Sequence, residues 1–147
     1  MKIYIVFLAM LLAGITALSY NSDMMKFVYE ENLLKAVAEE CASGAAMLQN
    51  EDAYSEGQTV FEEAEGLEYA QNHINYALSK KNGVKSFEVS LEFEDDEKGY
   101  SEKNSMLIPT VTATVTMKCE DIFRLPFITV SEVTRTSAYE LKERDAD

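Results

Sequence analysis

The chain opens with an unbroken apolar segment that passes into an amphipathic pattern. The sixteen residues Ile3–Leu18 carry no charge and follow a single basic residue, Lys2. Further along, apolar residues recur at three- and four-residue intervals, the spacing of one helical face, and no Pro or Gly lies between Ala17 and Ala42. The pattern predicts one long helix whose second half has an apolar stripe of Leu34, Val37, Ala38, Cys41, Ala45 and Leu48.

A second helix is predicted within residues 58–83, after a polar turn region at 49–57. Thr59 and Glu62 have the spacing of a capping box, although residues 59–61 can equally form a short strand. Gly83 stands where a C-terminal cap is expected. The apolar face of this helix is predicted to consist of Leu67, Ala70, Ile74, Ala77 and Leu78.

The remainder of the chain alternates apolar and polar residues, which is typical of half-buried antiparallel strands. One strand is predicted at 86–95, a second within 107–121, and a last one within 129–142 after a bend at 124–128. The fold class is therefore α+β. We expect an N-terminal transmembrane helix that continues into an amphipathic helix, and a second helix packed on an antiparallel sheet of three or more strands. The inward-facing sets are Phe87, Val89, Leu91 and Phe93 on the first strand, and Val111, Ala113, Val115, Met117 and Cys119 on the second.

The apolar segment is either a retained anchor or a removed signal peptide. A cut after Ser19 would place small residues at the two positions that a signal peptidase reads. The helical pattern beyond the segment, however, favours retention, with residues 1–20 as a transmembrane anchor or signal-anchor and 21–147 as an extracytoplasmic domain. Lys2 then stays inside, which places the C-terminal domain outside the cell membrane. A capping residue among 21–23 would instead break the helix at the membrane surface.

The composition shows that the chain is strongly acidic. There are 26 Asp and Glu against 13 Lys and Arg, which gives a formal net charge of −13. Phosphate backbones are bound by clusters of Lys and Arg, and no such cluster follows Lys2 in the sequence. Nucleic-acid binding and adsorption to anionic lipid headgroups are therefore not expected.

Candidate chemistry is sparse. Cys41 and Cys119 lack the spacing of a zinc or redox motif; they either pair as a disulfide or stay as buried thiols. His73 is the only histidine, and the acidic stretch 92–102 lacks the ligand spacing of a calcium-binding helix–loop–helix. We expect a non-enzymatic protein with no catalytic residue, cofactor or metal.

The layout resembles the membrane-anchored, pilin-like TadE/TadG proteins of tight-adherence (Tad) pilus systems. The resemblance is carried by the apolar first helix running into "LLKAVAEECASGAAM", then by antiparallel strands and the final "TVSEVTRTSAYEL". It implies an anchor helix that packs in, or at the base of, a surface filament, and no enzymatic activity. Type IV pilins are processed after a Gly that precedes the apolar helix, whereas Gly14 lies inside it here, so the unprocessed TadG-like members are the closer comparison.

Independently of the resemblance, the apolar segment carries small residues at helical spacing. Such residues let transmembrane helices approach closely, and we expect other membrane or pilus subunits to be the partners. The alternatives are a membrane-tethered binding or sensor module and a secreted soluble domain. The predicted helix-packing residues are Ala9, Ala13, Gly14 and Ala17.

Overall fold

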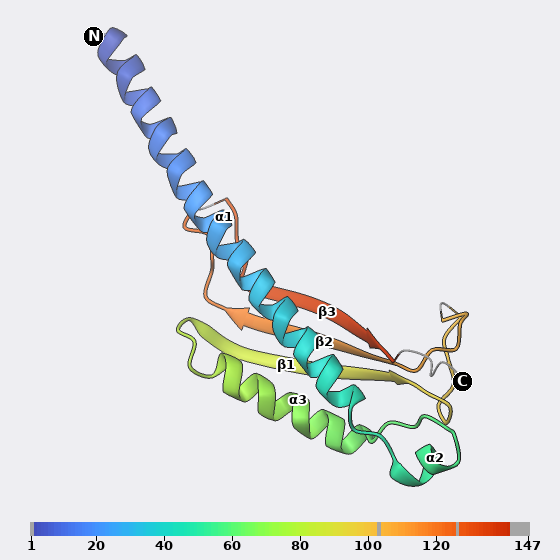
Figure 1. Ribbon diagram of the computed structural model, residues 1–147. Coiled ribbons are helices and arrows are strands. Elements are labelled where there is room, and N and C mark those ends of the chain that lie inside the picture. The colour runs from blue at the N-terminus through green and yellow to red at the C-terminus, as the bar shows by residue number, and fades with distance from the viewer. Residues whose placement is uncertain (1, 103, 126, 142–147) are drawn as a thin grey trace.

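The computed structural model describes residues 2–102, 104–125 and 127–141. It contains a long N-terminal helix, two further helices and a three-stranded sheet (Figure 1). The predicted α+β class is confirmed, as is the packing of helices against an antiparallel sheet. The elements in chain order are α1 (Lys2–Ala46), α2 (Glu51–Ser55), α3 (Glu63–Leu78), β1 (Val84–Glu94), β2 (Thr110–Cys119) and β3 (Glu132–Glu140).

The helix α1 is continuous over 45 residues. It does not break at residues 21–23, so the alternative of a separate capped helix is wrong: Asp23 is buried inside the helix and bonds to a distant loop instead of capping. The first half of α1 projects from the domain, and the second half lies across the sheet (Figure 1). The predicted stripe is buried from Leu34 to Ala45, whereas Leu48 lies beyond the end of the helix and is half-buried.

The three strands are antiparallel and lie in the order β1-β2-β3. The inward-facing sets predicted for the first two strands are confirmed: Phe93 pairs with Val111 and Met117 pairs with Phe87, all on the face toward the helices. The opposite face of β2 is rich in Thr, and Thr114 and Thr116 form hydroxyl pairs with β3. Strand pairing determines which connections lie at each end of the sheet (Figure 1). At the end near the projecting helix are the connections 79–83 and 120–131, and at the far end are 47–62 and 95–109.

The core fills the space between α1, α3 and the inner face of the sheet. Leu34 and Cys41 of α1, Ile74 of α3, and Val115 of β2 belong to one buried cluster. A smaller cluster at the far end of the sheet contains Ala45, Ala46, Phe61, Phe93 and Val111.

Details at the ends of elements differ from the sequence predictions. The turn region after α1 contains the one-turn helix α2, which Asn50 caps by accepting from the Ala53 N–H. Thr59 is not a helix cap, because α3 begins four residues later with Glu62 at its N-cap position. Gly83 is not a helix cap either; it adopts φ 86° in the turn that leads into β1.

The buried face of α3 agrees with the prediction at Ala70, Ile74 and Leu78, and it differs at Leu67. Leu67 is 39% exposed, and Gly66 is buried in its place. The reason is space: a Cβ at Gly66 would lie 3.2 Å from the Phe93 ring and 3.3 Å from the Ala45 side chain. The helix approaches α1 so closely there that a large side chain does not fit.

Candidate membrane anchor and its junction with the domain

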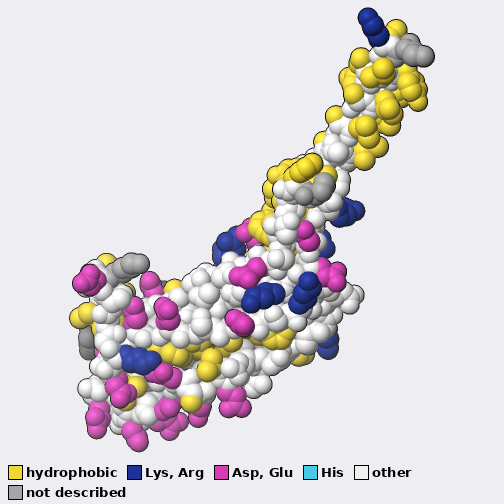
Figure 2. All heavy atoms as spheres, turned by 180° about the vertical axis from the view of Figure 1, so that it is seen from behind, with side chains coloured by type: hydrophobic (Ala, Val, Ile, Leu, Met, Phe, Trp, Pro, Cys, Tyr) yellow, Lys and Arg dark blue, Asp and Glu magenta, His cyan; other side chains and the backbone are white. Residues whose placement is uncertain are grey.

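The projecting half of α1 is a candidate membrane anchor. Among the described residues, α1 is the one helix that is long and apolar enough to cross a membrane, and the 18 residues of its apolar window bury nothing within the molecule. Hydrophobic side chains cover this projection (Figure 2). The feature is that of a single membrane span near the N-terminus, or of a signal sequence, which also meets these criteria of length and composition.

The Thr16 hydroxyl, a polar group within this segment, is satisfied inside the helix. It is 3.0 Å from the Leu12 carbonyl and 2.9 Å from the Ala13 carbonyl, and it donates to that pair. Lipid offers no hydrogen-bond partners, so a polar side chain in a spanning segment needs such internal bonding. Thr16 is therefore compatible with residence in a bilayer.

The four predicted helix-packing residues, Ala9, Ala13, Gly14 and Ala17, all lie on this exposed segment. A Cβ at Gly14 would have no neighbour within 4 Å. Their surface is thus open for close approach by another helix, and their role in packing stays a prediction.

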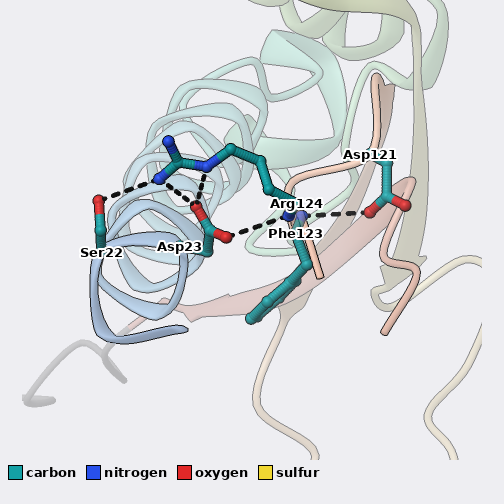
Figure 3. A network of polar contacts seen from close by, with 5 residues as sticks. All are labelled: Ser22, Asp23, Asp121, Phe123 and Arg124. Carbon is teal, nitrogen blue, oxygen red and sulfur yellow. Dashed lines mark hydrogen bonds and ion pairs between the residues drawn. The ribbon is translucent and has the colours of Figure 1, made fainter. Parts of the chain in front are cut away.

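The junction between the helix and the domain is built on Asp23, the first acidic residue of the chain (Figure 3). Arg124, from the loop between β2 and β3, donates to it three times: from its backbone N–H at 3.0 Å, from Nε at 2.9 Å and from Nη2 at 2.8 Å. A weaker contact of 3.4 Å links Nη2 to the Ser22 hydroxyl. Asp23 is buried, while the Arg124 side chain remains 68% exposed. Both carboxylate oxygens are therefore used to tie the loop to the helix.

Aromatic packing and a turn brace the same loop. The Phe123 ring is buried and lies 6.0 Å from the Tyr20 ring and 6.3 Å from the Phe27 ring, measured between centroids. Asp121 accepts from the backbone N–H groups of Phe123 and Val130, at 3.1 Å and 3.0 Å. The loop is thereby fixed against α1 between residues 20 and 27.

Hydrogen bonding by Arg124 lowers the pKa of Asp23 below its ordinary value of 3.8. The bonds favour the ionised carboxylate more than burial disfavours it. Asp23 is therefore a charged partner at neutral pH.

Sequence reasoning did not find this pair. Asp23 and Arg124 are 101 positions apart, and the local sequence marks Asp23 only as a candidate helix cap. A single acid directly after an apolar span and a single Arg within the apolar stretch 122–128 were the available signals. Neither signal indicates that the two residues are partners.

Both cysteines are buried free thiols of the main core cluster. The Cys41 thiol points at the Ala70 carbonyl, with 3.8 Å between sulfur and oxygen. Burial raises the pKa of Cys41 to about 11 and also raises the pKa of Cys119. Protonated, buried thiols are poor nucleophiles, so these residues pack rather than react.

The remaining polar candidates have structural partners. His73 lies 2.6 Å from Glu40, measured from Nε2 to Oε2, and stacks on Tyr69. Asp95 is buried and accepts from the backbone N–H groups of Phe61, Glu97 and Lys98. Within the described ranges, no group of three or more His, Cys, Asp or Glu residues is arranged to hold a metal ion.

No protein-family model, curated protein or solved structure matches this chain. The similarity to pilin-like proteins is one of shape alone: a long N-terminal apolar helix is followed by a small antiparallel sheet.

Proposed function

We propose that the chain is a non-enzymatic, membrane-anchored, pilin-like component of a Tad or type IV-type pilus or secretion assembly. The observation that carries the proposal is the division of α1, whose apolar first half is exposed and whose second half is built into the core. A helix of this kind joins a lipid or filament environment to an external domain without a flexible linker. The domain lies outside the membrane in this proposal.

The activity resides in contact between the anchor and other subunits. Ala9, Ala13 and Ala17 recur every four residues, and Gly14 adds a fourth small residue to the segment. Helices in lipid associate through close packing at small residues, because burial of apolar surface gives no advantage there. The partners are therefore other membrane-embedded subunits of the same assembly.

Replacement of Ala13 or Ala17 with Leu tests this contact. The substituted helix stays apolar and spanning, but the larger side chain obstructs close approach. We expect the variants to insert and fold normally, yet to lose crosslinks to partner subunits and pilus-dependent adhesion. Leu11→Ile is the matched control, since it changes a large apolar residue for another and leaves the small residues intact. If exchange of the whole 3–18 segment for an unrelated spanning helix leaves assembly and adhesion unchanged, the anchor is only a tether.

Retention of the anchor is tested by the intact mass of the protein extracted from membranes. The proposal expects the full-length mass in the membrane fraction. A mature N-terminus at Tyr20 in the culture medium contradicts it and supports a secreted soluble domain.

A membrane-tethered binding or sensor module is the second candidate. It is favoured by a hollow of about 290 Å³ between α3 and β1, lined by Gln71, Ile74, Asn75, Phe87, Glu88 and Val89. This volume is at the lower limit for a small-molecule site. Replacement of Asn75 by Phe would fill the hollow, and loss of signalling with intact assembly would favour this candidate.

A further inference from the structure

We infer that the loop between β2 and β3 is a second membrane contact, in which Phe127 enters the bilayer interface and holds the domain at a fixed orientation on the membrane surface. The inference rests on the proposed function, because it requires α1 to span the bilayer. The surface of the loop lies outside the spanning segment, and the lipid interface is its occupant.

The height of the loop follows from the length of the span. From Ile3 to Tyr20 the helix rises by about 26 Å, and the hydrocarbon core of a bilayer is about 30 Å thick. The lipid surface therefore lies near residues 20–23 of α1. The loop is fixed to the helix at this same height, through Phe123 against Tyr20 and through Arg124 on Asp23.

The tip of the loop is apolar and unsupported by the domain. The Ile128 N–H donates to the Leu125 carbonyl at 3.2 Å and closes a turn that contains Phe127. Phe127 is 93% exposed, the highest value among the large apolar side chains of the described chain. Entry of such an apolar ring into the membrane interface is favourable, because it removes apolar surface from water. The loop lies at the end of the domain from which α1 projects (Figure 1), and hydrophobic side chains also appear at that junction (Figure 2).

The charges are arranged to permit this contact. The two connections at the far end of the sheet, 47–62 and 95–109, hold eight acidic and two basic residues, whereas the two near the anchor, 79–83 and 120–131, hold two acidic and three basic residues. Among these connections the acidic surplus therefore lies away from the membrane, a separation that is not apparent from the net charge of −13. Arg124 and Lys26 are exposed beside the loop, at the level where cationic side chains reach lipid phosphates. The inferred contact thus departs, at the anchor-proximal end, from the expectation that the chain does not adsorb to anionic lipid headgroups.

Single-tryptophan fluorescence tests the inference without background, because the chain contains no Trp. Three full-length variants are reconstituted into phosphatidylcholine vesicles that contain lipid brominated near the headgroup or deep in the acyl chain. Phe127→Trp reports on the loop, and Leu12→Trp, near the middle of the 3–20 segment, reports on the span. Met47→Trp is the water-exposed control, because Met47 is exposed and lies one residue past the end of α1, about 40 Å from Tyr20.

We expect the shallow bromolipid to quench Phe127→Trp, with emission at shorter wavelength than that of Met47→Trp. The deep bromolipid should quench Leu12→Trp, and neither lipid should quench Met47→Trp. If Leu12→Trp is quenched but Phe127→Trp is quenched only by aqueous iodide, the loop does not touch the membrane, although the anchor stands. If Leu12→Trp escapes deep quenching, the spanning anchor itself is wrong, and the loop inference falls with it.

Discussion

The ion pair between Asp23 and Arg124 makes the stability of the fold depend on pH. Its pKa is lowered in the folded protein from an ordinary value of 3.8, so its ionised form stabilises the fold above that value. As pH falls through 3.8 toward the lower folded pKa, this contribution is lost. We expect wild type to exceed Asp23→Asn in urea midpoint at pH 7, and the difference to shrink as the pH is lowered below about 4.

Glu68→Gln is the control for this titration, because Glu68 is an exposed acid of α3. Its midpoint should follow wild type at both pH values. A difference between wild type and Asp23→Asn that is equal at pH 7 and pH 3 would contradict the assignment of the charge to the Arg124 contact.

Gly44 makes room for the Tyr69 ring. A Cβ at Gly44 would overlap Cε1 and Cζ of Tyr69 and pass 2.7 Å from its hydroxyl oxygen, and displacing the ring would break its stacking on His73 at 6.1 Å. Because these atoms are the outer end of a side chain that is 40% exposed, the ring can move aside, and we expect Gly44→Ala to destabilise the protein by under about 1 kcal/mol, although Ala is the better helix former. Chemical denaturation measures the change.

The Tyr69→Ala background reverses the sign of this effect. With the ring removed, Gly44→Ala should stabilise by up to about 1 kcal/mol, because only the helix propensity remains. An equal loss in both backgrounds would show that something other than the ring sets the cost.

At the scale of elements, α3 is held by a narrow set of buried residues. Ile74 is buried against the sheet, whereas Leu67 on the same helix is 39% exposed. Ile74→Ala should cost about 2–5 kcal/mol, and Leu67→Ala should cost under about 1 kcal/mol. Denaturant unfolding of the two variants compares them directly, and similar losses would mean that the face of α3 is oriented as the sequence predicted rather than as described.

The elements themselves were largely predictable from the sequence. Strands β1 and β2 alternate strictly, so each inward residue was named correctly, and the spacing from Leu34 to Ala45 gave the buried stripe of α1. The start of α3 and its buried Gly66 were not predictable, because the spacing of large apolar residues does not reveal where two helices approach most closely. Periodicity indicates which face of a helix is apolar, but it does not indicate how closely the neighbouring helix approaches that face.

At the scale of the whole molecule, the sequence predicted an anchor but not the way in which it is attached. The 101-residue separation of Asp23 and Arg124 hides the junction. The uneven distribution of acids appears only once the strands place two loops at each end of the sheet. Both features depend on topology, which composition and local pattern do not contain.

The domain should be independent of the projecting segment. Residues 2–18 are all exposed, while Tyr20 already contacts Phe123. A chain that begins at Tyr20 should therefore fold in detergent-free buffer, with a free energy of unfolding within about 0.5 kcal/mol of full length in detergent. Circular dichroism and denaturant titration check this, and a molten or aggregated product would show that the apolar half supports the fold.

The unbroken course of α1 through the junction has a geometric consequence. If the first half of α1 spans a membrane as proposed, the domain turns about the membrane normal only when that helix turns with it, because α1 has no break between its projecting half and the sheet. Each helical residue advances by about 100°, so one residue inserted between Leu18 and Asp23 would rotate the sheet by more than a quarter of a revolution relative to the small-residue face, whereas seven would return it almost to its starting direction. In the proposed assembly, the side on which the span meets a neighbour therefore dictates whether the β1 edge or the β3 edge of the sheet faces that neighbour outside the membrane.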